Sequence, residues 1–342
     1  MGRRPCLAPV GAALLAGSFA SCAHAQSSVQ LYGQVDAYVG AMHFSGAPGI
    51  AWQQSGGGMS TSYFGLKGSE DLGGNLKAVF ALEDFFRSNN GRYGSFDGQS
   101  FFARNSYVGL ETPAGTLTLG RNTVPLFVST ILFNPFIDSF NFSPMVLHTY
   151  IDSGLGPASV QGDTGWDNSV LYSSPSFNGL AGTLLYGNAG VPGHTGQANY
   201  GGNLLYFSGH LAATAAFQTV HDSSILFNGA SRQTTFQFGA TYDFTLLKLY
   251  AQYQIVNNDN QVRDNTSQLG ASVPLGAGNV RLSWVRTQRE RASNGDAIRN
   301  TAALGYVLPL SKRTSVYATY LYDKVSALAS GSSVGVGIRQ QF

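Results

Sequence analysis

The stretch Leu31-Tyr-Gly-Gln-Val-Asp-Ala-Tyr-Val39 decides the fold class, because its side chains alternate in character with a period of two. One face of an extended chain carries Leu31, Gly33, Val35, Ala37 and Val39, and the other carries Tyr32, Gln34, Asp36 and Tyr38. The last residues, Ser333–Phe342, alternate in the same way. Such alternation over about eight to ten residues predicts a strand with one buried face. A soluble β-sandwich alternates similarly, so the rest of the chain must decide between the two architectures.

Segments of this kind recur to the end of the chain, with no long helical pattern between them. We expect strands at 28–43, 58–69, 75–87, 101–111, 115–121, 166–174, 179–188, 199–208, 211–221, 232–244, 246–257, 264–273, 279–289, 297–308, 314–323 and 333–342. Their number is even, as in bacterial outer-membrane barrels, and 17 tyrosines with 22 phenylalanines suit aromatic girdles. The sequence therefore predicts an all-β fold, a 16-stranded antiparallel transmembrane β-barrel.

The connections between these segments alternate in length, which also favours a membrane barrel. Tight turns such as Asp71–Gly74 and Pro274–Gly278 alternate with longer polar stretches, as expected when short turns lie on one side of a membrane and long loops on the other. One connection, about 122–165, is too long for an ordinary loop. It holds five phenylalanines, so we expect it to pack on other parts of the protein, for which the barrel lumen is the obvious place.

The N-terminus has the three parts of a secretory signal peptide. Arg3 and Arg4 precede an apolar run that is too short to span a membrane, and an Ala-His-Ala sequence ends at Ala25. We expect cleavage there, which leaves 26–342 as a single β-barrel domain. Both cysteines lie before the cleavage site, so the exported chain would contain no disulfide. Its charges are few and nearly balanced, and they give no nucleic-acid footprint.

Several stretches resemble the trimeric general porins of Gram-negative outer membranes, particularly the β-proteobacterial type. The matching stretches are Ser27–Gly33, Phe64–Lys77, Arg104–Leu110, Leu119–Asn122, Asn168–Pro175, Leu310–Thr314 and Val336–Phe342. The most specific of them contains Gly-Leu-Lys-Gly-Ser-Glu-Asp-Leu-Gly from Gly65 to Gly73. Together they run from the first expected strand to the last, so the resemblance covers the whole mature chain.

The resemblance implies a homotrimer of 16-stranded barrels in the outer membrane. In each barrel the third extracellular loop would fold inward, and its acidic residues would face a basic cluster on the opposite wall. The field between them would screen solutes by charge and size. The terminal Phe342 is similar to the ending that such barrels present to the outer-membrane assembly machinery.

The chain departs from the family pattern at three places. Tyr63 stands where the family usually has arginine, and Gly165-Trp-Asp167 stands where an arginine often precedes the strand after the loop. Asn134–Asp138 replaces the usual loop motif, whereas Arg121 is kept. These departures predict a constriction that is less basic, more aromatic and narrower.

The candidate pore-lining residues follow from strand parity and from the resemblance. The basic side is assigned to Arg121, with Arg104 and Lys67 expected to face the lumen because a charge facing mid-membrane lipid costs about 2–4 kcal/mol. The acidic side is assigned to Asp138 and Asp152. Tyr63 and Gln34 complete the expected constriction: Arg121, Arg104, Lys67, Tyr63, Gln34, Asp138 and Asp152. The alternative for each charge is an ordinary lumen, rim or solvated loop position without a role in selectivity.

These observations predict a passive, water-filled channel for small hydrophilic solutes and ions, surrounded by outer-membrane lipid. No catalytic triad, metal-ligand spacing or phosphate-binding loop is found, so no enzyme activity, metal or cofactor is expected. A solute-selective channel on the same scaffold is the alternative, suggested by Tyr63, Trp166 and the aromatic loop. A non-conducting structural or soluble β-protein is the third possibility.

Overall fold

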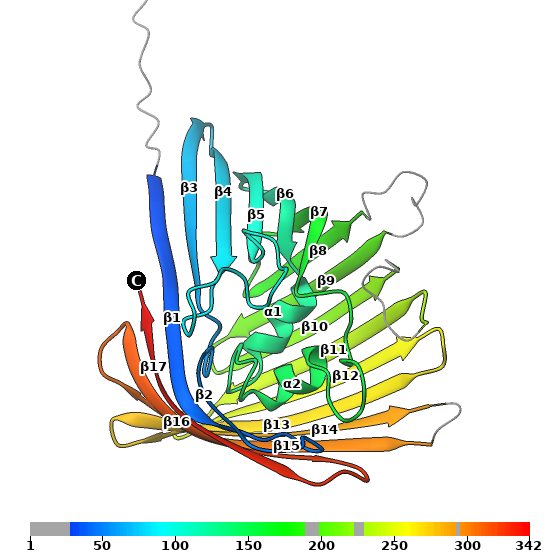
Figure 1. Cartoon of the computed structure of the whole chain (residues 1–342). Helices are drawn as coiled ribbons and strands as arrows, with labels where there is room; N and C mark the ends of the chain where they lie inside the picture. The colour runs from blue at the N-terminus through cyan, green and yellow to red at the C-terminus, as the bar shows by residue number, and fades with distance from the viewer. Residues whose placement is uncertain (1–27, 189–197, 222–228, 292–294) are drawn as a thin grey trace, which may run out of the picture.

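A computed structural model describes residues 28–188, 198–221, 229–291 and 295–342, and the predicted signal peptide, 1–25, lies outside them. The described chain forms one antiparallel sheet that closes on itself, because β1 pairs with β17 (Figure 1). The strands are β1 Ser28–Met42, β2 Ala51–Gly56, β3 Tyr63–Gly73, β4 Leu76–Phe85, β5 Asn105–Thr112, β6 Gly115–Thr123, β7 Gly165–Ser173, β8 Leu180–Gly187, β9 Asn199–Ser208, β10 Leu211–Val220, β11 Gln233–Asp243, β12 Lys248–Asn258, β13 Arg263–Leu275, β14 Gly278–Glu290, β15 Ala297–Pro309, β16 Thr314–Val325 and β17 Gly331–Gln341.

The predicted 16-stranded barrel is confirmed, because β2 and β3 occupy a single position in the ring. β3 pairs with the first half of β1, from Ser28 to Gln34, and β2 pairs with its second half, from Ala37 to Met42. Residues 57–62 leave the ladder between them. We call this segment the bulge.

The prediction of one continuous strand over 58–69 was therefore wrong. The cause is Asp36, whose carboxylate accepts the backbone N–H groups of Gly58, Met59 and Ser60 at 2.9, 3.2 and 3.2 Å. A buried backbone donor needs a partner, and here the partner is a side chain instead of the neighbouring strand. The expected strand over 101–111 also begins later, at Asn105.

The pleat of each strand separates a polar inner face from an apolar outer face. In β1, Gln34, Asp36 and Tyr38 are buried, whereas Leu31 and Val39 are 60% and 64% exposed. This is the reverse of a soluble protein, in which large apolar side chains face the core. It is the arrangement expected of a barrel surrounded by hydrocarbon. No helix within the described residues is long and apolar enough to span a bilayer.

The two ends of the barrel differ in the length of their connections. At one end the strands are joined by short turns, for example 74–75 between β3 and β4 and 113–114 between β5 and β6. The described residues begin at this end with Ser28 and finish there with Phe342, which exchanges backbone hydrogen bonds with Gly33. The connections at the other end are mostly longer. By the membrane-barrel rule, the short-turn end is periplasmic and the long-loop end is extracellular.

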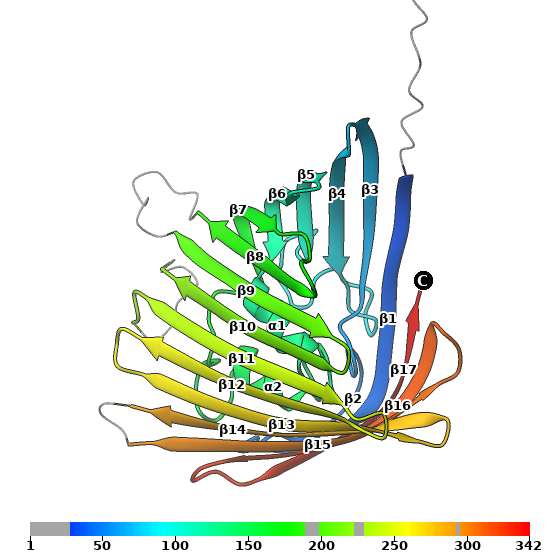
Figure 2. The same ribbon diagram turned by 180° about the vertical axis from the view of Figure 1, so that it is seen from behind.

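The longest connection, between β6 and β7, folds inside the ring (Figures 1 and 2). We call residues 124–164 the inner segment. It contains two short helices, α1 Pro125–Leu132 and α2 Pro144–Tyr150, and each begins with the proline that suits a first helical turn.

Inward-facing glycines on the barrel wall make room for the phenylalanines of the inner segment. A Cβ atom added to Gly239, Gly305 or Gly335 would lie 3.1, 3.0 or 2.7 Å from Phe133, Phe136 or Phe142 respectively. All three phenylalanines are fully buried. The segment therefore packs directly on the wall, and these glycines permit the close approach.

Candidate pore-lining site

Two buried ion pairs attach the inner segment to the wall. Arg299 of β15 pairs with Asp323 of β16 at 2.8 Å and donates to the carbonyl of Leu147 at 3.1 Å. The charged side chains of this pair and of the second pair, Arg289 with Asp264, are all at most 5% exposed. Each pair keeps its charges compensated while the arginine reaches across to the segment's backbone.

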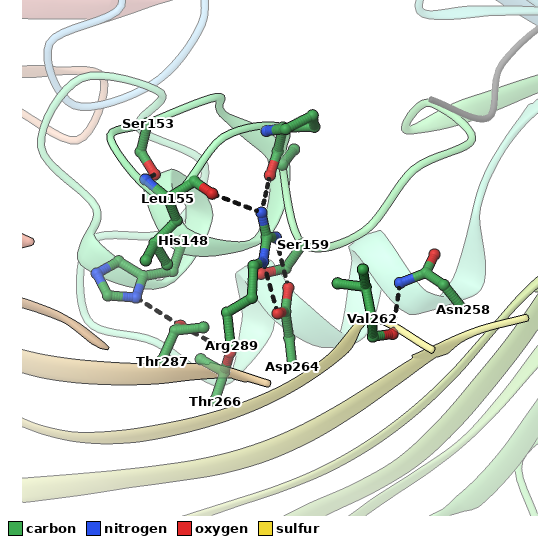
Figure 3. Close-up of polar contacts among 12 residues, drawn as sticks. His148, Ser153, Leu155, Ser159, Asn258, Val262, Asp264, Thr266, Thr287 and Arg289 are labelled. Carbon is green, nitrogen blue, oxygen red and sulfur yellow. Dashed lines mark hydrogen bonds and ion pairs between the residues drawn. The ribbon is translucent and has the colours of Figure 1, made fainter. Parts of the chain in front are cut away.

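The second pair, Arg289 with Asp264, has the same design (Figure 3). Its nitrogen and oxygen lie 2.6 Å apart, and Arg289 donates to the carbonyls of Leu155 and Pro157 at 3.2 and 2.9 Å. A guanidinium group can serve a carboxylate and two carbonyls at once because it carries five donors in a fixed plane.

His148 of α2 bridges β14 and β15, and Figure 3 shows its contact with Thr287 of β14. Its Nδ1 lies 2.7 Å from the hydroxyl of Thr287, and its Nε2 lies 2.7 Å from that of Thr301. Thr301 donates its own hydrogen to Asp323, so Nε2 must be the donor toward Thr301. Burial, followed by the charge of Arg299, holds the pKa of His148 well below its usual range, so the ring is neutral at neutral pH.

The far end of the inner segment docks on the bulge. Ser139 donates to the carbonyl of Gly58 at 2.7 Å, and Asn141 donates to that of Gly57 at 2.9 Å. Ser60 donates to the carboxylate of Asp138 at 2.5 Å. The segment thus reaches from α1, beside β8 to β11, across the lumen to the bulge beside β1.

The wall formed by β1, β3, β4 and β5 carries a polar and aromatic cluster. Glu83 accepts hydrogen bonds from Tyr32, Arg104 and Asn105. The guanidinium of Arg104 lies 4.1 Å from the centre of the Tyr63 ring. The structure therefore brings together two residues chosen from the sequence, and it compensates the charge of Arg104 with Glu83.

Lys67 and Gln34 lie on the same wall, and both face inward as parity predicted. The Nζ of Lys67 lies 4.6 Å from the centre of the Tyr32 ring and forms no ion pair within the described residues. Gln34 donates to the hydroxyl of Ser60, which in turn donates to Asp138. Gln34 and Asp138 are thus joined through one serine, which links the wall to the inner segment.

Arg121 and Asp152 lie apart from this cluster. Arg121 pairs with Asp163 at 2.6 Å and Asp167 at 2.9 Å, where the inner segment returns to the wall. Asp152 accepts the backbone N–H of Ala158 at 2.9 Å and thereby closes a turn within the segment. Arg121 thus fixes the C-terminal end of the inner segment, and Asp152 fixes a turn within it.

Besides the four residues of the two buried ion pairs, further inward-facing charges were not chosen from the sequence, among them Glu83, Arg281 and Arg339. Within the described residues, neither arginine forms an ion pair. The signal for both was available in the alternation, since Arg339 lies on the polar face of the quoted C-terminal stretch. Arg281 alternates likewise with outward-facing Leu282 and Trp284.

The inner segment also presents an aromatic edge. The rings of Phe127 and Tyr150 meet edge to face with centres 5.3 Å apart, and those of Phe127 and Phe140 lie 6.2 Å apart. All three side chains are half-buried, so each keeps a part of its surface accessible. The segment is therefore more apolar than the wall cluster around Glu83.

The chain matches a family model described as Gram-negative porin over residues 11–328. It is 30% identical to an outer membrane porin protein of Bordetella pertussis, with 97% of this chain and 99% of that protein covered. It is 29% identical to outer membrane porin protein 32 of Delftia acidovorans, again over 97% and 99% of the two chains.

Solved structures give the same result. The anion-selective porin from Comamonas acidovorans aligns with a TM-score of 0.77 and 28% identity, covering 93% of this chain and all of that one. The trimer form of OmpT from Vibrio cholerae shares the fold at 14% identity, with a TM-score of 0.67 over 92% of this chain and 99% of that one. The closed barrel, the full-length family match and these relatives agree: this chain belongs to the Gram-negative porin family and is an outer-membrane porin.

Proposed function

We propose that this porin lets small hydrophilic solutes and ions diffuse passively, without catalysis, and that it prefers anions to cations. The observation that carries the anion preference is the group of inward-facing cations without an ion pair in the described chain: Lys67, Arg281 and Arg339. Charges of one sign in a narrow passage with low-dielectric walls raise the local concentration of the opposite ion. The similarity to an anion-selective porin supports the same direction.

The carboxylates near these cations are engaged with the bulge. Asp36 accepts four hydrogen bonds, from three backbone N–H groups and the hydroxyl of Tyr317. Asp138 accepts from Ser60. Hydrogen-bond donors spread and offset the charge of a carboxylate. The three cations therefore dominate the field felt by a passing ion.

We further propose that the inner segment narrows the pore. In this proposal Tyr63, Lys67 and Arg104 line the passage on the wall side, and Gln34 and Asp138 line it where the segment meets the bulge. Arg121 and Asp152 contribute indirectly, since Arg121 fixes one end of the segment and Asp152 fixes a turn within it. The support is the set of contacts that fixes the segment inside the ring.

We infer a homotrimer, embedded in outer-membrane lipid after removal of residues 1–25. The outer surface offers a partly exposed aromatic cluster at β3 and the loop after β4: Phe64, Phe86, Tyr93 and Phe101, whose ring centres lie 5.7 to 6.4 Å apart. Exposed apolar patches of this kind suit a protein or lipid contact. Phe342, which is 42% exposed, is the residue proposed to be recognised by the assembly machinery.

A solute-selective channel is the second candidate, and the aromatic edge of Phe127, Phe140 and Tyr150 is the observation that favours it. Aromatic faces in a pore can hold an apolar part of a solute that the charged wall orients. A selective channel would be blocked by its solute at sub-millimolar concentration. A general diffusion pore would show no such block.

The anion preference is tested by the zero-current potential of single channels in a potassium chloride gradient. The wild-type protein is expected to give the sign of an anion-preferring pore. Tyr63→Arg should shift the potential further in the same direction, because it adds a second cation beside Arg104. Tyr63→Gln, which removes the ring without adding charge, is the matched control. An unchanged potential in Tyr63→Arg would place position 63 away from the narrowest part of the pore.

The preference should also depend on pH through Asp138. Burial raises the pKa of the Asp138 carboxyl above its usual value of 3.8. As the pH is lowered from neutral, Asp138 is therefore protonated before an exposed aspartate is. Loss of this negative charge makes the lumen more positive, so anion preference should rise as the pH falls.

The same zero-current measurement, repeated as the pH is lowered from neutral, checks this dependence. Asp138→Asn should show a higher anion preference than the wild type at neutral pH and a smaller rise as the pH falls. A wild-type potential that stays constant, or an Asp138→Asn variant that responds to pH as strongly as the wild type, would contradict the role given to Asp138.

A further inference from the structure

We propose that Arg281 and Arg339 together form a binding site in the lumen for a small doubly charged oxyanion, of the class of sulfate or hydrogen phosphate. The inference rests on the proposed anion-preferring pore and goes beyond it. A general preference needs only a positive field, whereas a binding site requires two donor groups that converge on one ligand.

Arg281 is held in place without having its charge compensated. It lies on the inward face of β14, and its Nη1 is 3.5 Å from the sulfur of Met59 in the bulge. Met59 is fully buried, so the bulge supports the guanidinium from one side. A thioether sulfur is only a weak acceptor, so most of the donors of Arg281 remain available.

Arg339 lies on the inward face of β17, directly opposite Asp36 of β1 in the strand register. This carboxylate would be the obvious partner, but its oxygens are already engaged. One accepts from Gly58 N at 2.9 Å and from the Tyr317 hydroxyl at 2.5 Å, and the other from Met59 N and Ser60 N at 3.2 Å each. Because both oxygens of Asp36 accept hydrogen bonds from the bulge, Arg339 forms no ion pair in the described chain.

The two arginines flank the same few residues. Arg281 contacts Met59, the backbone N–H of Met59 donates to Asp36, and Arg339 stands opposite Asp36 in the strand register. Both arginines are partly accessible from the lumen. Two like charges held together beside a partly desolvated surface repel each other, and an anion between them relieves that repulsion.

The geometry of guanidinium favours an oxyanion over chloride as the ligand. Each guanidinium presents parallel N–H donors that match two oxygens of one ligand, and such bidentate bonds are among the strongest polar contacts in proteins. A tetrahedral oxyanion has enough oxygens to serve both arginines. Its two negative charges match the two positive charges, which a single chloride cannot do.

The test is block of single-channel chloride current by sulfate, compared with methanesulfonate, which has a similar shape and one charge. We expect sulfate to block the wild type at a concentration at least about tenfold lower than methanesulfonate, which corresponds to about 1.4 kcal/mol. Arg281→Gln and Arg339→Gln should each raise the blocking concentration of sulfate about tenfold. Arg313→Gln, which removes an exposed charge from the periplasmic turn before β16, should leave it unchanged.

Arg281→Lys and Arg339→Lys keep the charge and remove the planar fork. They should keep the sign of the zero-current potential, because the positive charge stays, and lose most of the sulfate block. This result distinguishes bidentate binding by the two guanidinium groups from a general attraction by positive charge. It does not depend on whether the glutamine variants fold.

Equal block by sulfate and methanesulfonate in a wild type that still prefers anions would overturn the site and leave the proposed function standing. Full sulfate block in the lysine and glutamine variants would also overturn it. A wild-type zero-current potential of the cation sign would instead overturn the proposed function itself.

Discussion

Replacing Asp323 with asparagine is expected to lower the free energy of unfolding of the barrel by about 3–5 kcal/mol, because it leaves the buried Arg299 without a counter-charge. Both side chains are at most 2% exposed, so water cannot compensate for the loss. Asp323 also accepts hydrogen bonds from Thr301 at 2.6 Å and from the backbone of Ser45 at 3.1 Å. Asparagine keeps the size of the side chain and removes its charge.

Because Arg299 and Thr301 also hold α2 through Leu147 and His148, the same substitution should loosen the inner segment. We therefore expect larger current fluctuations in single-channel records of Asp323→Asn than in those of the wild type. Denaturant unfolding of the detergent-solubilised barrel, extrapolated to zero denaturant, measures the change in stability.

Glu111→Gln is the matched control for this substitution. It is also an acid-to-amide change in an ion pair, with Lys77 at 3.3 Å, but both side chains are 47% exposed. Exposed pairs contribute roughly 0–1 kcal/mol. Similar losses in the two variants would mean that burial of the Arg299 pair has no energetic consequence, which would contradict the role assigned to it.

The strands could be predicted from the sequence because the pleat imposes a period of two on the side chains. In β1, the outward-facing Leu31, Val35 and Val39 and the inward-facing Gln34 and Asp36 are sorted by lipid on one side and water or protein on the other. The alternation of side chains did not predict the bulge. Residues 57–62 are held by Asp36, which lies more than twenty residues earlier in the chain. A local pattern carries no information about such a partner.

For the candidate pore-lining residues, the face of the wall on which each side chain lies could be predicted in the same way. Parity placed Lys67, Arg104 and Gln34 on the inner face, where the structure has them. The hydrogen-bond partners of these residues could not be inferred, because pairing depends on the register of neighbouring strands and on where the inner segment turns. Arg104 meets Glu83 across β4 and β5, and Arg299 meets Asp323 across β15 and β16.

The helices of the inner segment were not anticipated either. The phenylalanines indicated that residues 122–165 would pack on something, and the wall glycines opposite them lie more than a hundred residues later, at Gly239, Gly305 and Gly335. Matching the two sets requires the closed barrel. Pro125 and Pro144, which begin the helices, were the local signals that the sequence offered.

Removing the inner segment should raise the single-channel conductance severalfold, because the segment packs inside the ring against wall strands from β8 to β17. The ends of the segment suit such an excision. The backbone N–H of Val124 donates to the carbonyl of Thr164 at 2.9 Å, so a short glycine-serine linker can join the flanking residues without strain. Strand content by circular dichroism reports whether the shortened barrel still folds.

A second variant tests the same placement without deleting anything. The hydroxyl oxygens of Ser129 in α1 and Thr214 in β10 lie 2.9 Å apart, so the double substitution Ser129→Cys and Thr214→Cys brings two thiols near enough to form a disulfide. The oxidised double variant should keep the wild-type conductance, since the bond only fixes a contact that already exists.

The single-channel conductance of the excised barrel is the most direct test of the central claim that residues 124–164 occupy the lumen and set its width. The account predicts a stable, ohmic channel with severalfold higher conductance than the wild type, together with formation of the engineered disulfide between positions 129 and 214 in the full-length double variant. A folded excised barrel with unchanged conductance, or failure of the two introduced thiols to pair in a folded protein, would contradict it.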